Sequence, residues 1–85
     1  MSSFFAQSLK LGAMEYLKHP AFLKKLGQNI RKIRKQKGIS QQELSFRTEL
    51  SRNQIGRIER GEINTGVSTI YEIAQGLEVA VKDIF

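Results

Sequence analysis

One stretch, residues 40–61, constrains the fold more than any other part of the chain. It reads SQQELSFRTELSRNQIGRIERG and contains two signals for the start of a helix. Ser40 is followed three positions later by Glu43, the spacing of a capping box, in which side chains and backbone N–H groups bond reciprocally. Further on, Ser51 can cap a second helix, which we expect to end at Gly61. The stretch therefore predicts two short helices joined by a tight turn.

The second of these helices presents two different faces. At about 100° per residue, Ile55 and Ile58 point to one side and form an apolar base. The opposite arc spans roughly 140° and contains no acid; its members are Arg52, Asn53, Gly56, Arg57 and Arg60. Guanidinium and amide groups bind base edges and phosphates, so the arc predicts a nucleic-acid-binding face. The alternative for Arg52 and Arg57 is a solvated surface role without a partner.

The charge distribution agrees with this interpretation. The net charge is +6, and it is unevenly placed. Residues 24–60 contain eleven Lys and Arg against three acids, whereas residues 61–85 contain one base and four acids. This asymmetry suggests that one face of the protein meets a polyanion and another does not. Lys-rich surface helices also occur without a partner, so the charge by itself does not identify the ligand.

The composition leaves little for catalysis or metal binding. The chain has no cysteine and one histidine, His19, which directly precedes Pro20 and suits a turn or a helix entry. No thiolate zinc site, histidine cluster, paired carboxylates or activated nucleophile is evident. We therefore predict that the protein is not an enzyme and binds neither a metal nor a cofactor.

The chain has the size of one small domain. Its 85 residues allow a single core. No apolar run approaches the roughly 20 residues of a membrane span, and the N-terminal MSSFFAQ lacks the early basic cluster of a signal peptide. We expect no membrane association and a cytoplasmic location, at the nucleoid.

Helical spacing predicts two helices before the central stretch. The first covers residues 4–18 and is amphipathic, and His19 and Pro20 end it. The second covers residues 20–37, with Gly38 as its C-terminal cap. Its expected buried stripe consists of Phe22, Leu23, Leu26, Ile30 and Ile33.

Two side chains within these helices lie outside the simple pattern. Arg34 is at the edge of the apolar stripe, where an unpaired guanidinium is costly, so it needs a partner. Phe46 points away from Leu44. It is either a solitary exposed aromatic or a contact for another helix or chain.

A further helix is expected after the loop that follows Gly61. Thr65 is its candidate N-cap, and its expected buried face consists of Val67, Ile70, Tyr71, Ile73, Ala74 and Leu77. Gly76 interrupts this helix, which indicates either close packing or an approaching helix end. Residues 79–85 are apolar enough to complete the core or to pair with a second copy.

Two helices joined by a short turn, the second with exposed base-reading side chains, define the helix-turn-helix motif. From Leu26 to Phe85 the chain resembles the phage repressor and Cro type of this motif, the XRE family. The matching segments are LGQNIRKIRKQKGISQQELS, LSRNQIGRIERGE and STIYEIAQGLEVAVKDIF. The resemblance implies an all-α fold, a compact five-helix repressor-like DNA-binding domain at residues 20–85 with its motif at 40–61. An additional N-terminal amphipathic helix would form a separate extension, residues 1–19.

The resemblance also implies roles for individual residues. Positions that reach base edges in the major groove are occupied by Arg52, Asn53 and Arg57. Positions that contact phosphates are occupied by Gln41, Arg60 and Asn64. Gln41 would in addition brace the start of the recognition helix. Arg34 and Glu59 would form a partly buried, structural salt bridge between the first family helix and the recognition helix.

Some positions depart from the family pattern. Glu49 stands in the turn where glycine is usual, so we expect a strained or altered backbone there. Ser45 replaces a common alanine and Thr65 a frequent proline. Gly56 lies in the DNA-facing arc, where a side chain is usual; it either allows a closer approach to the groove or is merely tolerated.

The predicted function is a sequence-specific regulator of transcription that binds double-stranded DNA as a homodimer on an inverted repeat. Two surfaces are candidates for the dimer contact. One is the C-terminal group Val79, Val81, Ile84 and Phe85; the other is the N-terminal helix with Phe46. The alternative function is an antitoxin-type module, which would bind a partner protein through the N-terminal helix and Phe46 and regulate its own synthesis through the same motif.

Overall fold

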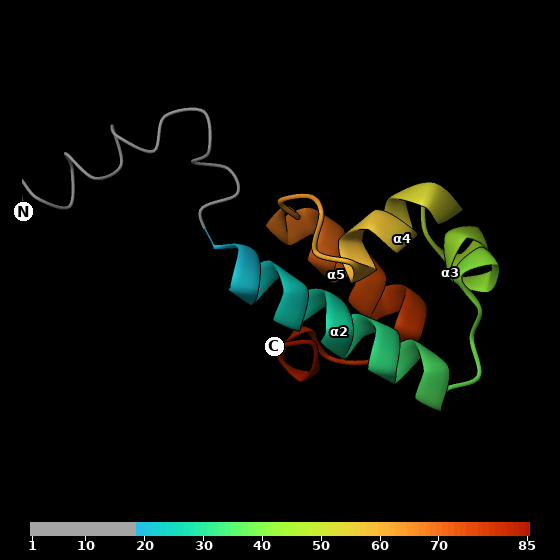
Figure 1. Cartoon of the computed structure of the whole chain (residues 1–85). Helices are drawn as coiled ribbons and strands as arrows, with labels where there is room; N and C mark the ends of the chain where they lie inside the picture. The colour runs from blue at the N-terminus through green and yellow to red at the C-terminus, as the bar shows by residue number, and fades with distance from the viewer. Residues whose placement is uncertain (1–18) are drawn as a thin grey trace, which may run out of the picture.

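The computed structural model describes residues 19–85, which form helices joined by short turns and loops, with no strand in this range (Figure 1). The elements are α2 (Pro20–Gln36), α3 (Gln41–Arg47), α4 (Arg52–Glu59), α5 (Val67–Leu77) and a 3-10 turn, η2 (Val81–Asp83). The all-α prediction is confirmed for these residues. They contain one helix fewer than the five predicted, because the last element is a single 3-10 turn. The helix predicted at residues 4–18 lies outside the described residues.

Helix α2 follows the predicted boundaries closely. Pro20 occupies its first turn, and Gly38 follows its end with φ of 70°, a conformation that glycine adopts without strain. The buried stripe of α2 is Leu23, Leu26, Gly27, Ile30 and Arg34. The prediction that Phe22 belongs to this stripe was wrong, since its side chain is 54% exposed. Phe22 lies at the edge of the stripe and stacks on Phe85, with ring centroids 6.2 Å apart.

The core lies between α2, α4 and α5, with α3 closing one end (Figure 1). Its fully buried side chains are Ile30, Leu44, Ile55, Ile73, Leu77 and Ile84. Ile84 brings the C-terminal segment into this core, and Asn29 Nδ2 of α2 donates to the Ile84 carbonyl at 2.9 Å. Residues 79–85 therefore complete the core, which is one of the two roles expected for them. No described helix is long and apolar enough to cross a membrane.

Two glycines let helices approach closely. A Cβ atom on Gly27 would lie 2.4 Å from the carbonyl oxygens of Ile58 and Glu59, so the backbones of α2 and α4 are in direct contact. A Cβ atom on Gly76 would lie 2.9 Å from Leu44 Cδ1 and from Thr48 Cγ2. Gly76 is thus explained by close packing of α5 against α3, and Gly27 holds the end of α4 against α2.

Helix α5 begins one residue later than predicted. Gly66, rather than Thr65, is its N-cap, and no side chain caps it. Ile70, Ile73, Ala74 and Leu77 are buried as expected, but Val67 is 85% and Tyr71 55% exposed. The buried stripe follows the i, i+3, i+4, i+7 pattern and is narrower than the apolar sequence. Val67 and Tyr71 therefore lie along its solvent-facing edge.

The backbone of the turn between α3 and α4 is unstrained, contrary to the strain expected at Glu49. Among the described non-glycine residues, only Glu78 has a positive φ. The backbone N–H of Glu49 donates to the Glu72 carboxylate of α5, and that of Leu50 donates to Thr48 Oγ1 at 3.2 Å. The turn is thus held by side chains in an ordinary conformation, so it does not need the left-handed residue that glycine would supply.

Candidate nucleic-acid interface

Serine N-caps fix the starts of α3 and of α4, the predicted recognition helix. Ser40 Oγ accepts from the Glu43 backbone N–H at 2.9 Å at the start of α3, and Ser51 Oγ accepts from the Gln54 backbone N–H at 3.0 Å at the start of α4. Both serines cap as predicted. The Glu43 carboxylate does not complete a capping box, because it accepts from Arg47 Nε at 3.3 Å instead.

Helix α4 is anchored on one face and open on the other. Ile55 and Ile58 are 1% and 2% exposed in the core. The side chains of Arg52, Asn53 and Arg57, the predicted base-contacting residues, are exposed. Gly56 is buried against the side chains of Gln41 and Arg60 rather than open to solvent.

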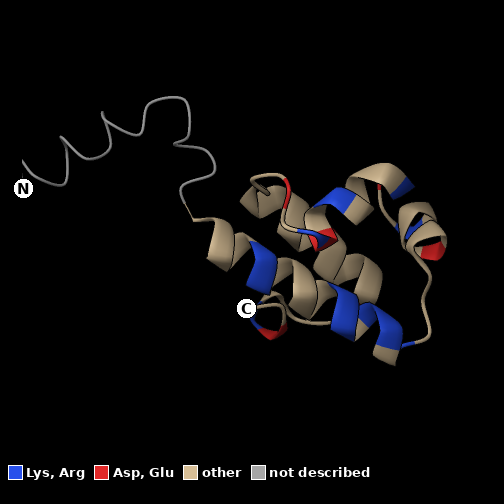
Figure 2. Ribbon diagram, in the orientation of Figure 1, with Lys and Arg blue, Asp and Glu red and all other residues tan. Residues whose placement is uncertain are grey.

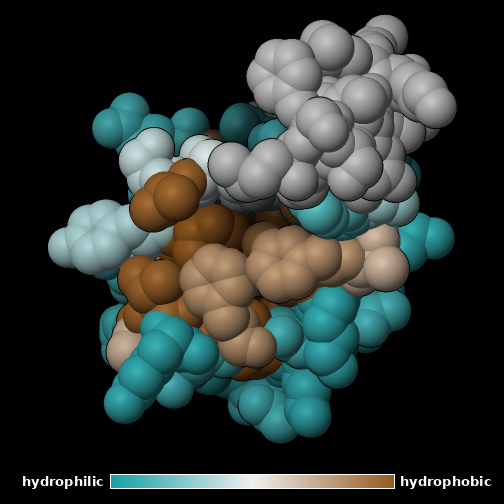
Figure 3. Space-filling model, turned by 90° about the vertical axis from the view of Figure 1, so that its left-hand side faces the viewer, coloured by the Kyte–Doolittle hydropathy of each residue, from teal (hydrophilic) through white to brown (hydrophobic). Residues whose placement is uncertain are grey.

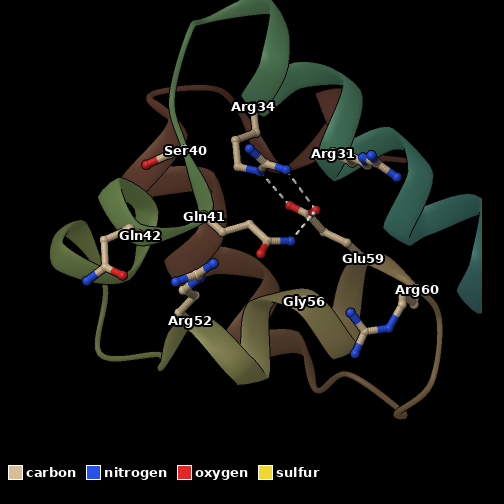
Figure 4. A pocket seen from close by; sticks show the side chains of 9 residues that line it. All are labelled: Arg31, Arg34, Ser40, Gln41, Gln42, Arg52, Gly56, Glu59 and Arg60. Atoms are coloured by element: carbon tan, nitrogen blue, oxygen red, sulfur yellow. Dashed lines mark hydrogen bonds and ion pairs between the residues drawn. The ribbon is translucent and has the colours of Figure 1, made fainter.

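A buried polar network links α2, α3 and α4. Arg34 Nε and Nη2 donate to the two Glu59 carboxylate oxygens at 2.7 and 3.0 Å, and Arg34 Nη1 donates to the Ile39 carbonyl at 2.9 Å. Gln41 Nε2 donates to Glu59 Oε1 at 3.0 Å (Figure 4). Arg34 and Glu59 are 7% and 6% exposed, so the ion pair is buried and its hydrogen-bonding groups are occupied. This network holds the C-terminal half of α4 against the start of α3.

Of the predicted phosphate-contacting residues, Gln41 belongs to this network and Arg60 has an internal partner of its own. Arg60 Nε and Nη2 donate to the Glu62 carboxylate at 2.7 and 3.3 Å, and Arg57 Nε lies 3.9 Å from it. The hydrogen bond from Arg60 lowers the pKa of Glu62, and the same bond raises the pKa of Arg60. Asn64 is exposed in the α4–α5 loop. Sequence reasoning missed Glu62, although an acid two residues after a predicted phosphate anchor was a visible signal.

We expect Glu62→Gln to raise the affinity for duplex DNA by about two- to fivefold, because the neutral amide no longer competes with phosphate for Arg60 and Arg57. Glu62 has a lowered pKa and therefore stays ionised, so the gain should be constant from about pH 6 to about pH 8. Titration of both proteins against the same duplex by fluorescence anisotropy measures the effect. Lower affinity of the variant would mean that Glu62 orients Arg60 for binding instead.

Charge is segregated around this site. Lysine and arginine residues line α2 and recur on α4, while acids lie on the α4–α5 loop and the C-terminal turn, with others on α3 and at the end of α4 (Figure 2). Within residues 19–85, no group of three His, Cys, Asp or Glu side chains is arranged to hold a metal ion. The arrangement suits binding of a polyanion by an exposed helix.

Two short helices joined by a tight turn, the second with an exposed polar face, define the helix-turn-helix class. The family model described as Helix-turn-helix matches residues 30–84, and the chain belongs to this family, the XRE type of DNA-binding transcriptional regulators.

Relatives within this family are regulators. The chain is 41% identical over 59 residues to the control protein C.BamHI of Bacillus amyloliquefaciens, covering 68% of this chain and 73% of that protein. It superposes on the crystal structure of the restriction-modification controller protein C.AhdI from Aeromonas hydrophila with a TM-score of 0.75 at 37% identity, over 76% and 98% of the two chains. The controller protein C.Esp1396I, solved as a tetramer with its natural 35 base-pair operator, matches with a TM-score of 0.66 at 34% identity, over 73% and 92% of the chains.

Proposed function

We propose that this regulator binds double-stranded DNA in a sequence-specific manner, as a homodimer on an inverted-repeat operator. The observation that carries the proposal is the division of α4, whose apolar side is fixed in the core while Arg52, Asn53 and Arg57 are exposed. Recognition of base edges requires a helix that is held rigidly by the core, because each side-chain contact depends on the position of the helix in the groove. The proposal places its action in the cytoplasm, at the nucleoid.

Six polar residues in and around α4 have a role in this proposal. Arg52 and Arg57 can each donate two hydrogen bonds to guanine, and Asn53 can bind adenine. The Gln41 Nε2 amide has two N–H groups. One donates a hydrogen bond to Glu59, and the second would donate to a DNA phosphate. Arg60 and Asn64 contact phosphates of the flanking DNA backbone. Arg60 first breaks its hydrogen bonds to Glu62.

The dimer contact is assigned to the apolar end of the molecule, defined as Phe22, Val67, Tyr71 and Phe85. All four are more than half exposed. They belong to the starts of α2 and α5 and to the C-terminus, which lie at one end of the fold, where Figure 3 shows apolar side chains gathered. A contiguous apolar surface of this kind marks an interaction site. Of the C-terminal group predicted for the contact, Ile84 is 0% exposed and cannot contribute, whereas Phe85 can.

Val67→Asp tests this assignment with little risk to the fold. Val67 is 85% exposed at the first position of α5, where an acid is favourable to the helix dipole. A carboxylate buried in the dimer contact should weaken dimerisation by more than about tenfold, measured by sedimentation equilibrium, with the melting temperature retained. Ser68→Asp adds the same charge one residue further on, at another exposed position, and should leave the dimer intact. Equal dimerisation of the two variants would place the contact elsewhere.

Selection of bound duplexes from a random pool, repeated at two salt concentrations, tests the function itself. We expect an inverted repeat whose half-sites contain G and A, at a spacing that places two recognition helices about 34 Å apart. A pool that stays random, with affinity that collapses as salt rises, would reduce the protein to a non-specific polyanion binder.

The relatives suggest a biological setting for this activity. C.AhdI and C.Esp1396I are restriction-modification controller proteins, and the latter was solved on operator DNA. Control of such a system is the candidate role that we propose here. The alternative of an antitoxin-type module gains no support from these relatives, although Phe46, 74% exposed on α3, is a described feature available to a partner protein.

A further inference from the structure

A shallow hollow lies between α2, the start of α3 and α4, beside the recognition helix. Its volume is about 710 Å³. Figure 4 shows Arg31 of α2 on one side and Arg52 of α4 and Arg60, which directly follows α4, on the others, with Gln41 and Glu59 between them. Arg31 lies outside the helix-turn-helix motif, and the sequence pattern did not single it out.

The hollow carries an excess of positive charge. Four arginines and one acid line it: Arg31, Arg34, Arg52, Arg60 and Glu59. The acid is already bound by Arg34 and by Gln41, and it is 6% exposed. Arg60 is held by Glu62. Within residues 19–85, Arg31 and Arg52 form no ion pair, so the rim presents two cations that lack an internal counter-charge.

The base of the hollow is shaped by a missing side chain. A Cβ atom on Gly56 would lie 3.1 Å from Arg60 Nη1 and 3.7 Å from Gln41 Nε2. A larger residue would therefore press on the Arg60 guanidinium, whereas the Gln41 amide would be at an ordinary van der Waals distance. Glycine here leaves room for the Arg60 guanidinium beside the Gln41 amide at the base of the hollow.

The hollow is continuous with the face that is proposed to read bases. A smaller depression next to it is lined by Gln41, Arg52, Asn53, Gly56 and Arg60. Arg52 therefore borders both the hollow and the base-reading face. In a helix-turn-helix the recognition helix lies in the major groove while the first helix of the motif, here α3, crosses the DNA backbone, and the start of α3 borders the hollow.

From this geometry we infer that the hollow is the seat of a DNA backbone phosphate and that Arg31 is its phosphate-binding residue from α2. The inference rests on the proposed function. Arg31 would neutralise a phosphate oxygen from one side while the Gln41 amide donates from the other, and Arg52 at the border stays available for a base. Because a phosphate has the same chemistry at every base pair, Arg31 would raise the affinity for all duplexes and fix the orientation of α2 against the strand, without adding sequence preference.

The neighbouring residue Lys32 provides a matched control. It also carries a positive charge on α2, but it lines a different depression, with Asp83 and Phe85 near the C-terminus. Arg31→Ala and Lys32→Ala thus remove the same charge one residue apart, from two different faces of one helix. Both side chains are exposed, so both variants should keep the melting temperature of the wild type.

The test is a salt series of dissociation constants, for the selected operator and for an unrelated duplex. Arg31→Ala should weaken both by a similar factor, about three- to tenfold, and lower the slope of log K against log salt by about 1 per protomer. Lys32→Ala should change neither, and Arg31→Lys should restore most of the slope. An unchanged slope for Arg31→Ala, or a loss confined to the operator, would overturn the assignment.

Two further outcomes separate this inference from its alternatives. If the wild type selects no operator, the proposed function fails. If it selects one and Arg31→Ala behaves as the wild type, only the assignment of the hollow fails. Inorganic phosphate, at ionic strength matched with chloride, should not weaken DNA binding beyond chloride. A stronger effect of phosphate that Arg31→Ala abolishes would reassign the hollow to a free phosphate-bearing ligand and overturn the backbone assignment.

Discussion

Glu59→Ala is expected to lower the free energy of unfolding by about 3–5 kcal/mol, the range for breaking one partner of a buried ion pair. Arg34 is 7% exposed, and both its Nε and Nη2 bonds end on the Glu59 carboxylate. After the substitution it keeps only the Ile39 carbonyl, and Gln41 loses its acceptor as well. Urea unfolding followed by circular dichroism measures the loss, and an unchanged melting temperature would show that the pair is not structural.

Two comparisons sharpen this experiment. Glu43→Ala removes an exposed ion pair, with Arg47 at 3.3 Å, and should change stability by less than about 1 kcal/mol. The double variant Arg34→Met with Glu59→Leu replaces both charges by apolar groups and should recover much of the stability lost in Glu59→Ala. If the double variant is as unstable as the single one, lost packing rather than an unpaired charge explains the effect. We expect the bases preferred by Glu59→Ala to remain those of the wild type, since Glu59 is buried and faces Arg34.

Arg57→Ala should weaken operator binding by about 1–3 kcal/mol per half-site, the usual contribution of a bidentate arginine–guanine contact. Arg57 lies on the exposed face of α4, and within residues 19–85 its ion pair is with Glu62, at 3.9 Å, so the fold should be unaffected. Because a base contact is lost, the preference at one position of the half-site should also disappear. Dissociation constants for the operator and for each single-base variant of it measure both effects.

The control variants for Arg57 distinguish base reading from general attraction. Arg57→Lys keeps the charge but loses the two-pronged donor geometry, so it should bind random duplexes normally and still lose the base preference. Gln54→Ala changes an exposed residue of the same helix outside the basic arc and should have little effect. If Arg57→Ala weakens the operator and a random duplex equally, Arg57 contacts phosphate and reads no base.

Local signals were sufficient to predict the helix boundaries of the motif. Ser40 and Ser51 accept backbone hydrogen bonds within their own first turns, and Gly38 and Gly61 adopt positive φ next to helix ends. These interactions involve residues a few positions apart, so they are encoded in short segments. The requirement of Arg34 for a partner could also be recognised from its place at the edge of an apolar stripe.

The burial of edge residues could not be predicted in the same way. Phe22, Val67 and Tyr71 are apolar at helical spacing, yet all three are exposed, because periodicity gives the direction of a buried face and not its width. That width depends on how near the neighbouring helices lie. Gly27, which allows α4 to touch the backbone of α2, sets one of these distances and had no distinct signal of its own.

The amino-acid sequence by itself determined the family, the helix-turn-helix and the composition of the exposed face of α4, since each follows from residues close together in the chain. Only the tertiary structure decided which charges in that region are already neutralised. Glu62 pairs with Arg60 and lies near Arg57, and Arg31 is brought to the hollow beside Arg52 and Arg60 by the packing of α2 on α4. The electrostatics of a site depend on distances through space, and those distances are set by the close contact of helices that the chain places far apart.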